Sequence, residues 1–547
     1  MENIEAKKKE LKELLSREYF FRVPEYQRPY SWDQEHFTDL IQDLIDAKKD
    51  QEYFLGTIVV HKKDGVNDVV DGQQRLTTIM ILLACLRDMI DDKDFKLSIQ
   101  EKIIQKENIV DGIPEKVRIE VKDREIFNEL IITENGTKTQ KEGESLAEPQ
   151  WRYVTAIKIF NEKLKNFSQE NLRDFTKFIS QKCILVYLST NTFEDAFRLF
   201  IIVNDRGKQL RRIDILKASN ISPTVIKSDV VRNSLSQKWE EWEKNLGGET
   251  FEQVIFLLRL LLIGEKSQYD LLVEFEERIF KKGLVSKGEK FIDVVCDYAS
   301  MYNDLFEDYS YFDTNPNKIR IIGLLYIMNN EFKSNEWKAV LLLYLKKFKQ
   351  KEIETLLSML EMKYIEGWIS GSSTDVRIVA AGNIIKAINT AKKPADVFTS
   401  DSLKVDKDKM LHQLGDEIYG KQYCKYILLR LELLASENDV EKKIKAKSIE
   451  HVLPQTPKGD SKWLNDFTLE ERKFWLNRLA NLVLLSKSKN SSASNYEFNE
   501  KKNKYLREKV SDYPRSIEIL GIAEWTPEQL QTRQNLLLEK ALDDIFI

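Results

Sequence analysis

The sequence predicts an α+β protein that is mostly helical, and three observations support this fold class. Residues 1–225 alternate between helix and strand patterns. Residues 226–440 show helical periodicity with few glycines or prolines. Residues 441–547 change to the order strand, loop, strand and helix. Because 547 residues are too many for one hydrophobic core, we expect each of these three segments to form its own domain.

Apolar spacing and turn residues assign the N-terminal elements. Asp64-Gly65 is a hairpin signal between two strand-like runs, and the apolar residues after Gly72 recur with helical spacing. Apolar positions at Ile4, Leu11 and Leu14 favour a helix at the start of the chain. We expect helices over 2–16, 33–48 and 73–90, strands over 53–61, 68–71 and 183–188, and an irregular loop and hairpin region over 91–150.

Composition and charge exclude several classes of protein. The net charge of −4 argues against a protein that coats DNA non-specifically, because such binding depends on neutralising phosphates. No apolar run approaches the roughly 20 residues of a membrane span, and the first residues lack the apolar stretch of a signal peptide. The four cysteines are far apart and form no CxxC pair, which fits a reducing cytoplasm.

The C-terminal segment carries a set of residues suited to phosphodiester hydrolysis. His451 follows Glu450 at the end of a strand-like run, and Asn481 and Asn490 come later. Histidine is a natural general base near neutral pH, and Glu450 and Asn490 offer the oxygen ligands that Mg²⁺ or Mn²⁺ prefers. We expect Asn481 to pin the loop between two strands through its amide. This is the inventory of an HNH-type nuclease that uses one metal ion.

The charge of the C-terminal segment differs from that of the rest of the chain. Residues 441–547 hold 19 Lys/Arg and 16 Asp/Glu, a net of +3, so the remainder carries −7. A basic cluster in this segment includes Lys501, Lys502 and Lys504, which we assign to DNA binding. A solvated helix face is the alternative, and charge alone favours it.

A second candidate site lies where the strand over 68–71 meets the following helix. Gly72 makes the turn, and Gln73, Gln74 and Arg75 form the first turn of that helix. A helix N-terminus presents free N–H groups and a partial positive charge, which suits a phosphate. Asp71 could bind a metal, position water or cap the helix. No GxxxxGK[ST] motif occurs, so a P-loop is excluded.

Motifs at both ends of the chain resemble one known family. Residues 23–32, 71–77 and 204–217 resemble, in order and spacing, the ParB-like N-terminal domain of the GmrSD family of type IV restriction enzymes. Residues 451–455, 478–482 and 490–501 resemble the HNH-like C-terminal domain of the same family, with a ββα-metal fold. One departure is Ala480, where the family usually has glycine.

The resemblance implies a nucleotide-gated nuclease. It implies that the N-terminal domain binds and hydrolyses a nucleoside triphosphate and helps to sense modified DNA. It leaves two interpretations of the aromatic segment 26–32, as the lining of a nucleotide or DNA pocket or as core packing, and packing is favoured for Tyr30 and Trp32. The nucleotide-binding residues that it implies are Gln27, Arg28, Asp71, Gly72, Gln73, Gln74, Arg75, Asn204 and Arg206.

These expectations combine into one leading function. It is a modification-dependent DNA endonuclease of phage defence, in which NTP binding gates a Mg²⁺-dependent cut. The expected partners are modified double-stranded DNA, a nucleoside triphosphate and a second copy of the chain. The alternative is an NTPase switch, or a sensor of modified DNA such as phosphorothioate DNA, whose nuclease domain is secondary. The sequence leaves open which modification and which NTP are recognised.

Overall fold

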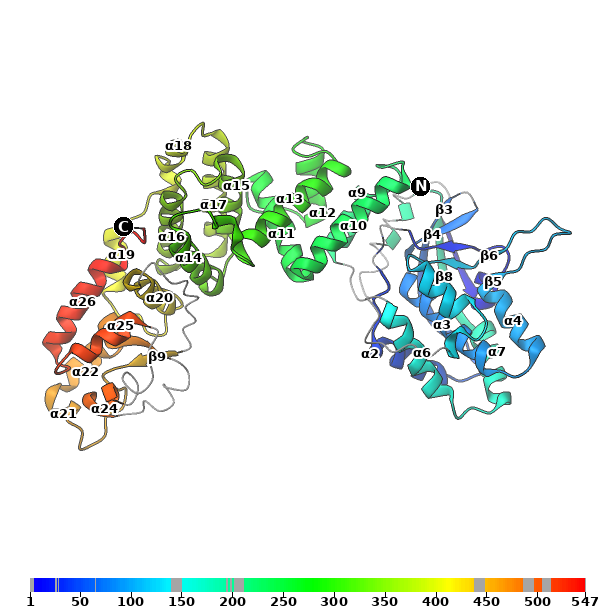
Figure 1. The fold of residues 1–547 in the computed structure, drawn as a ribbon, viewed down its shortest axis with the longest axis horizontal. Coiled ribbons are helices and arrows are strands. Elements are labelled where there is room, and N and C mark those ends of the chain that lie inside the picture. The colour runs from blue at the N-terminus through cyan, green and yellow to red at the C-terminus, as the bar shows by residue number, and fades with distance from the viewer. Residues whose placement is uncertain are drawn as a thin grey trace. The chain divides into compact units, whose positions relative to one another are not determined.

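The computed structural model describes residues 4–24, 27, 29–63, 65–138, 150–192, 195–196, 199–200, 211–436, 448–485, 496–503 and 513–546. It divides into two compact units (Figure 1), Met1–Trp239 with Lys287–Ile292, and Glu240–Ser286 with Asp293–Ile547. Helices dominate and accompany a small mixed sheet, in agreement with the predicted α+β class. Within the described ranges, no helix is both long enough and apolar enough to cross a membrane.

The first unit is built on a six-stranded mixed sheet with the order β1-β8-β3-β4-β2-β7. β3 pairs parallel with β8 and antiparallel with β4, so the predicted strands and their hairpin are confirmed. Gly65 at the hairpin has a φ of +74°. The strands are β1 (Glu5–Glu10), β2 (Phe21–Arg22), β3 (Tyr53–Lys63), β4 (Val66–Asp71), β7 (Ile119–Glu120) and β8 (Cys183–Thr190).

The helix expected over 2–16 is wrong for its first half. Residues Glu5–Glu10 form the edge strand β1, which pairs antiparallel with β8, and only Leu11–Leu14 form a helix, α1. The charged side chains of β1 meet oppositely charged neighbours, such as Lys62 beside Glu5. Pairing with a distant strand therefore overrides local helix preference, as tertiary context commonly does.

Helices pack on this sheet. α2 (Gln34–Asp46) and α3 (Gln73–Met89) agree with the sequence prediction. The expected loop over 91–150 is wrong at α4 (Lys93–Ile103), whose N-terminus is capped by Asp92 and which buries Ile99 and Ile103. The hairpin in that region is confirmed by β5 (Ile104–Gln105) and β6 (Lys116–Val117). The helices α6 (Gln150–Leu164), α7 (Gln169–Lys182) and α9 (Arg212–Asn220) follow along the chain, and α10 (Asp229–Leu246) begins in the first unit and ends in the second.

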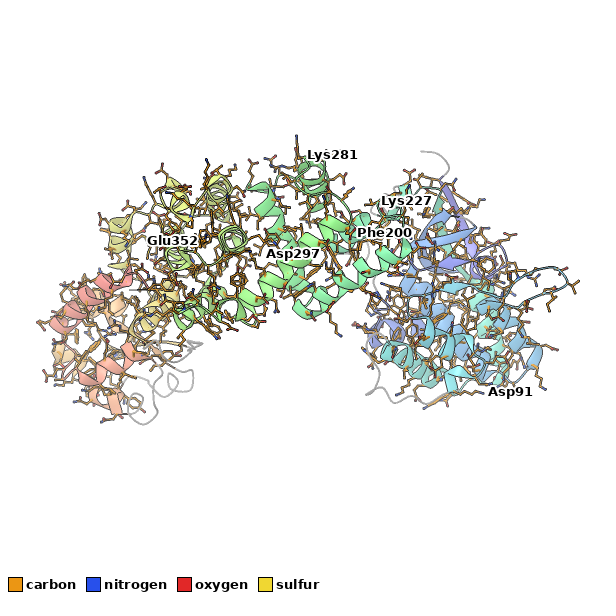
Figure 2. The ribbon with its side chains drawn as sticks, turned by 45° about the horizontal axis from the view of Figure 1, so that its top comes forward. Asp91, Phe200, Lys227, Lys281, Asp297 and Glu352 are labelled. Carbon is orange, nitrogen blue, oxygen red and sulfur yellow. The ribbon has the colours of Figure 1, made fainter. Side chains whose placement is uncertain are left out.

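The second unit consists mainly of helices with buried apolar faces, as predicted for the middle of the chain. Many charged side chains lie outside, such as Lys281 (Figure 2), which pairs with Glu277 at 2.6 Å. The main helices are α11 (Gly248–Ile263), α13 (Glu289–Phe306), α14 (Lys318–Glu331), α15 (Glu336–Phe348), α16 (Ile353–Ile369), α17 (Thr374–Thr390), α19 (Lys407–Leu414) and α20 (Cys424–Ala435).

A buried ion pair fastens the helical part of this unit to the end of the chain. Arg430 on α20 donates to Glu361 on α16 at 2.9 Å, and neither side chain is exposed. The same guanidinium donates to the carbonyls of Ala541 and Asp543 at 2.9 and 2.6 Å. Ala541 is the last residue of α26 (Pro527–Ala541), which is capped by Thr526 as predicted. The C-terminal helix is thereby held against the middle of the chain.

Candidate active site

The C-terminal residues form a strand–strand–helix element. β9 (Ser448–His451) pairs antiparallel with β10 (Leu482–Leu485), and His451 lies opposite Leu482. The short helix α24 (Phe498–Lys501) follows. The apolar cluster behind the element includes Trp463, Trp475 and Trp525. The expected order of two strands and a helix is therefore present, and it places Glu450 and His451 at the end of β9.

Asn481 pins the chain between the strands, as the sequence predicts. Its Oδ1 accepts from the Leu453 amide at 2.7 Å, and its Nδ2 donates to the carbonyls of Leu453 and Leu476 at 3.1 and 2.9 Å. The side chain is fully buried. Because both ends of the amide are used, Asn481 fixes the path of the chain just after His451 and just before β10.

Ala480 shows why glycine is not required before Asn481. It lies in a 3₁₀ helix, η8 (Leu479–Asn481), and is not among the described residues with positive φ. Its amide donates to Gln534 Oε1 at 2.8 Å, and its carbonyl accepts from Arg533 at 3.1 Å. An ordinary backbone conformation, held by two side chains of α26, therefore accommodates alanine.

His451 is buried, with 7% of its surface exposed. Its Nε2 lies 3.4 Å from Asn477 Oδ1, and its ring meets Tyr419 with centroids 4.2 Å apart. Asn477 Nδ2 donates to Glu417 at 3.2 Å, which orients the amide with its oxygen towards the imidazole. From this contact we assign the proton of the neutral ring to Nε2, which makes Nδ1 the basic nitrogen. Burial lowers the pKa of His451 below 6.5, and the positive charge of Lys501 lowers it further. The hydrogen bond with Asn477 raises this pKa but does not cancel the other two effects.

Glu450 is also buried, and a lysine neutralises it. Lys501 Nζ lies 2.9 Å from Glu450 Oε1 and 2.7 Å from the carbonyl oxygen of His451. The exposed fraction of Lys501 is only 2%. Burial lowers the pKa of Lys501, whereas the charge of Glu450 and its hydrogen bond act in the opposite direction. One ammonium thus contacts both residues of the Glu-His pair.

The predicted metal site is only partly within the described residues, since Asn490 lies outside them. Among the described residues, no group of three or more His, Cys, Asp or Glu side chains is placed to hold a metal ion. Mg²⁺ commonly uses only one or two protein carboxylates together with waters and substrate phosphate, and Glu450 fits that mode. A cation at Oε1 would have to share the carboxylate with Lys501 or displace it.

Two of the predicted DNA-binding lysines, Lys501 and Lys502, are bound within the protein. Lys502 Nζ donates to the carbonyl of Ile522 at 2.7 Å and lies 4.7 Å from the ring centroid of Phe498. Lys501 is held by Glu450, and Lys504 lies outside the described residues. The DNA-binding assignment of Lys501 and Lys502 finds no support in this placement, because both ammonium groups are bound within the protein.

The predicted phosphate-binding turn is present in the first unit. β4 ends at Asp71, and α3 begins directly after Gly72. Gly72 has a φ of +90°, and a Cβ there would lie 2.6 Å from Ile58 Cγ2, so both backbone conformation and space require glycine. Arg75 donates to the carbonyl of Thr57 at 3.2 Å and packs over Gly56. Burial lowers the pKa of Arg75, and Asp71 opposes this.

Gln27 and Gln74 tie the segment before α2 to this turn. Gln74 Oε1 accepts from the Ser31 amide at 2.8 Å, and Gln74 Nε2 donates to the Pro29 carbonyl at 3.1 Å. Gln27 Nε2 donates to the Val70 carbonyl at 2.9 Å. These amides therefore shape the rim of the candidate nucleotide site. Gln73 is buried at the start of α3, next to Gln74.

The aromatic residues near the predicted nucleotide site pack against neighbouring side chains, and three of the predicted binding residues lie outside the described residues. Tyr30 is buried, donates to or accepts from Thr78 at 2.7 Å, and contacts Tyr153, so it packs as predicted. Trp32 stacks on His36. Arg28, Asn204 and Arg206 lie outside the described residues.

The sequence did not reveal two residues that contact His451. Asn477 ends the short helix α22 (Leu469–Leu476), and Tyr419 comes from the turn between α19 and α20. Asn477 precedes Asn481 by one helical turn, which is the only local signal. Tyr419 has no signal, because its contact joins segments about thirty residues apart.

Two models of known protein families match the chain, one near each end. The N-terminal domain of the GmrSD restriction endonucleases matches residues 11–221, and the C-terminal domain of these enzymes matches residues 404–540. No curated protein matches the chain. The second match includes His451, Asn477, Asn481 and Lys501, and also Tyr419. The chain belongs to the GmrSD family of restriction endonucleases.

Proposed function

We propose that this restriction endonuclease cuts modified DNA with an HNH-type centre at His451 and that NTP binding in the first unit gates the cut. One observation carries the proposal: His451 is held by Asn477 through Nε2, which leaves Nδ1 as the base, and Glu450 precedes His451 on β9. Because its pKa lies below 6.5, the imidazole is mostly neutral at pH 7 and able to accept a proton.

In the proposed reaction, His451 Nδ1 accepts a proton from a water molecule as the water oxygen attacks phosphorus. A new P–O bond forms, the bond to the leaving deoxyribose oxygen breaks, and that oxygen receives a proton from solvent. Asn477 keeps the ring in its reactive orientation, and Asn481 holds the strand that presents it. The chain thus supplies the base and its alignment.

A bound Mg²⁺ or Mn²⁺ ion would supply charge stabilisation at the phosphate. Glu450 would be one ligand, and Asn490 is the predicted second. The oxygen character of both side chains supports a hard cation. Lys501 already neutralises Glu450, so metal binding at this carboxylate would compete with the ion pair.

We place the NTP at the N-terminus of α3, among Asp71, Gln74 and Arg75. The left-handed turn at Gly72 supports this assignment, because α3 begins directly after it and a helix N-terminus offers its first amides to an anion. Among the described residues, the four cysteines are buried and form no disulfide, which is compatible with a cytoplasmic protein. Modified double-stranded DNA is the proposed substrate, and a homodimer is the proposed assembly.

The test is cleavage of plain, glucosylated-hydroxymethylcytosine and phosphorothioate DNA with Mg²⁺, with and without each NTP. We expect cutting of one modified DNA and a dependence on one NTP. His451→Ala should reduce cleavage at least ~100-fold while leaving DNA binding and NTP turnover intact. His412→Ala, at an exposed histidine of α19, is the matched control and should cut normally.

Other outcomes would redirect the assignment. Persistent cleavage by His451→Ala would exclude this histidine as the base. NTP hydrolysis without cleavage of any DNA would favour the NTPase switch. Equal cutting of plain and modified DNA would remove modification dependence while keeping the nuclease.

A further inference from the structure

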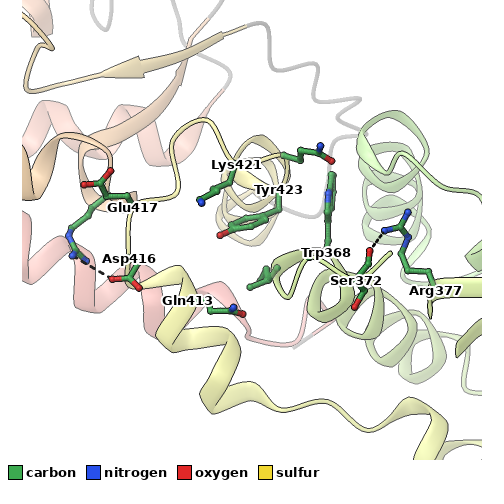
Figure 3. A pocket seen from close by; sticks show the side chains of 12 residues that line it. Trp368, Ser372, Arg377, Gln413, Asp416, Glu417, Lys421 and Tyr423 are labelled. Carbon is green, nitrogen blue, oxygen red and sulfur yellow. Dashed lines mark hydrogen bonds and ion pairs between the residues drawn. The ribbon is translucent and has the colours of Figure 1, made fainter. Parts of the chain in front are cut away.

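A large polar cavity lies within the second unit, beside the candidate active site. It is open to solvent and has a volume of about 850 Å³, which is typical of small-molecule sites. Its wall combines the end of α16, the start of α17, the turn between α19 and α20, and Arg478 (Figure 3). The lining residues include Trp368, Arg377, Glu417, Lys421 and Gln422.

Trp368 gives this wall a fixed aromatic surface. Its ring meets Phe332 edge-on with centroids 5.5 Å apart and lies 6.0 Å from the ring of Tyr426. These contacts hold the indole in place, yet Trp368 is only half-buried and lines the cavity. A rigid indole with an accessible part is the usual stacking surface for a nucleobase.

Cationic side chains line the same cavity as the indole, together with the carboxylates of Asp416 and Glu417. Arg377 donates through its terminal nitrogens to the Ser372 carbonyl at 2.7 Å and to Thr374 at 3.2 Å. Its Nε is buried without a hydrogen-bond partner among the described residues. Lys421 is exposed at the rim. A buried N–H without an acceptor is uncommon in proteins, and a shift of the Arg377 side chain towards the cavity would let a phosphate oxygen accept from it.

A second donor of the same kind lies close by. Tyr364 lines a smaller hollow that shares Trp368, Arg377 and Gln422 with the cavity. Its hydroxyl is also buried without a hydrogen-bond partner among the described residues. Gln422 adds an amide, which can donate to and accept from a base edge. This mixture of an aromatic face, amides and cations suits a nucleotide better than an apolar ligand.

The cavity shares a wall with His451. Glu417 lines the cavity and accepts from Asn477, and Asn477 orients His451. The amides of Ile418 and Tyr419 both donate to the Asn477 carbonyl, at 2.9 and 3.1 Å. The turn that carries Glu417 and Tyr419 would therefore separate a nucleotide in the cavity from the base His451.

We propose that this cavity binds one unpaired nucleotide of the DNA substrate, with its base on Trp368 and its phosphate near Arg377 and Lys421. The inference rests on the proposed function, because that function supplies the DNA. Occupation of the cavity would hold the DNA against the turn that carries Tyr419 and so position a phosphate for His451.

The experiment measures binding without cleavage, in the full chain with His451→Ala and without divalent metal. The probe is a short duplex with one unpaired 2-aminopurine, whose fluorescence falls when it stacks on an indole. We expect Trp368→Ala to weaken its binding about tenfold or more and to abolish the quenching. Trp368→Phe should retain most of the affinity. Phe256→Ala, at an exposed aromatic residue of α11, is the matched control.

Lys421→Gln provides a second variant at an exposed residue that should fold normally. It should weaken binding at low salt and lower the salt dependence by about one phosphate contact. Unchanged binding and quenching in Trp368→Ala would overturn the proposal. The proposal would also be wrong if Trp368→Ala weakened the binding of a free nucleoside triphosphate and left the binding of the DNA probe unchanged. The cavity would then be a site for free nucleotides. Neither outcome depends on cleavage, so the nuclease assignment is tested separately.

Discussion

Lys501 Nζ lies 2.9 Å from Glu450 Oε1, and both side chains are buried. This ion pair joins α24 to β9 and places a positive charge beside His451, whose backbone carbonyl accepts from the same ammonium. A residue that the sequence suggested for DNA contact is therefore the internal charge partner of the candidate active site.

Replacing Lys501 should change the pH dependence of cleavage. Cleavage needs neutral His451, so the rate rises with pH through its pKa, which the Lys501 charge lowers. Lys501→Met should therefore move the acidic limb of the pH–rate profile to higher pH. It should also destabilise the fold by about 3 kcal/mol, because Glu450 loses its partner. Lys462→Met, at an exposed lysine, is the control, and an unmoved limb would contradict this role.

Replacing Asn481 should destabilise the second unit. Asn481→Ala leaves the Leu453 amide and the carbonyls of Leu453 and Leu476 without their side-chain partner. We expect a loss of about 3 kcal/mol in the free energy of unfolding, measured by urea denaturation. Asn465→Ala, at an exposed position, should stay within about 0.5 kcal/mol. Equal stability of the two variants would show that the pinning is dispensable.

The turn before α3 should not tolerate a side chain. Gly72→Ala combines a φ of +90° with a Cβ 2.6 Å from Ile58, and we expect a loss of at least about 2 kcal/mol. Gly65→Ala measures the backbone effect alone, because φ at Gly65 is +74° and no atom lies within 4 Å of a Cβ at this position. It should cost only about 1 kcal/mol. Thermal unfolding of both variants makes the comparison, and a smaller effect at Gly72 would refute the steric argument.

Glu432 should make stability depend on pH. Burial raises the pKa of this α20 carboxyl to about 7 from 4.5, against the Arg515 hydrogen bond and nearby arginines. Because the folded pKa is the higher one, the stabilisation is complete below about pH 4.5 and is lost as pH rises through 7. From pH 4.5 to 8, wild type should lose about 3 kcal/mol more than Glu432→Gln. Parallel stability profiles of the two proteins would contradict this, and Glu539→Gln, at an exposed position, is the control.

The sequence predicts those features that short segments determine. Asp64-Gly65 and Gly72 specify the β3–β4 hairpin and the start of α3, and Thr526 with Pro527 specifies the start of α26. The strand β1 escapes such reasoning, because its conformation depends on β8, about 180 residues later.

The candidate site follows the same rule. The Glu450-His451 pair and the pinning by Asn481 are visible in local motifs, whereas the roles of Tyr419 and Lys501 depend on tertiary packing. A lysine in a basic run looks solvated in sequence, and only the fold shows that Glu450 and the His451 carbonyl surround it. The cavity beside Asn477 draws its wall from four separate segments and has no sequence motif.

The position of β8 between β1 and β3 has a consequence for synthesis on the ribosome. The ribosome makes β1 and β3 early, and both strands pair with β8. β3 ends at Lys63, whereas β8 is complete only at Thr190. At roughly 5–20 residues per second, the ribosome takes about 6 to 25 s to make the intervening segment. During that interval the nascent chain exposes a strand edge of β3, so a chaperone that shields this edge would raise the yield of folded protein.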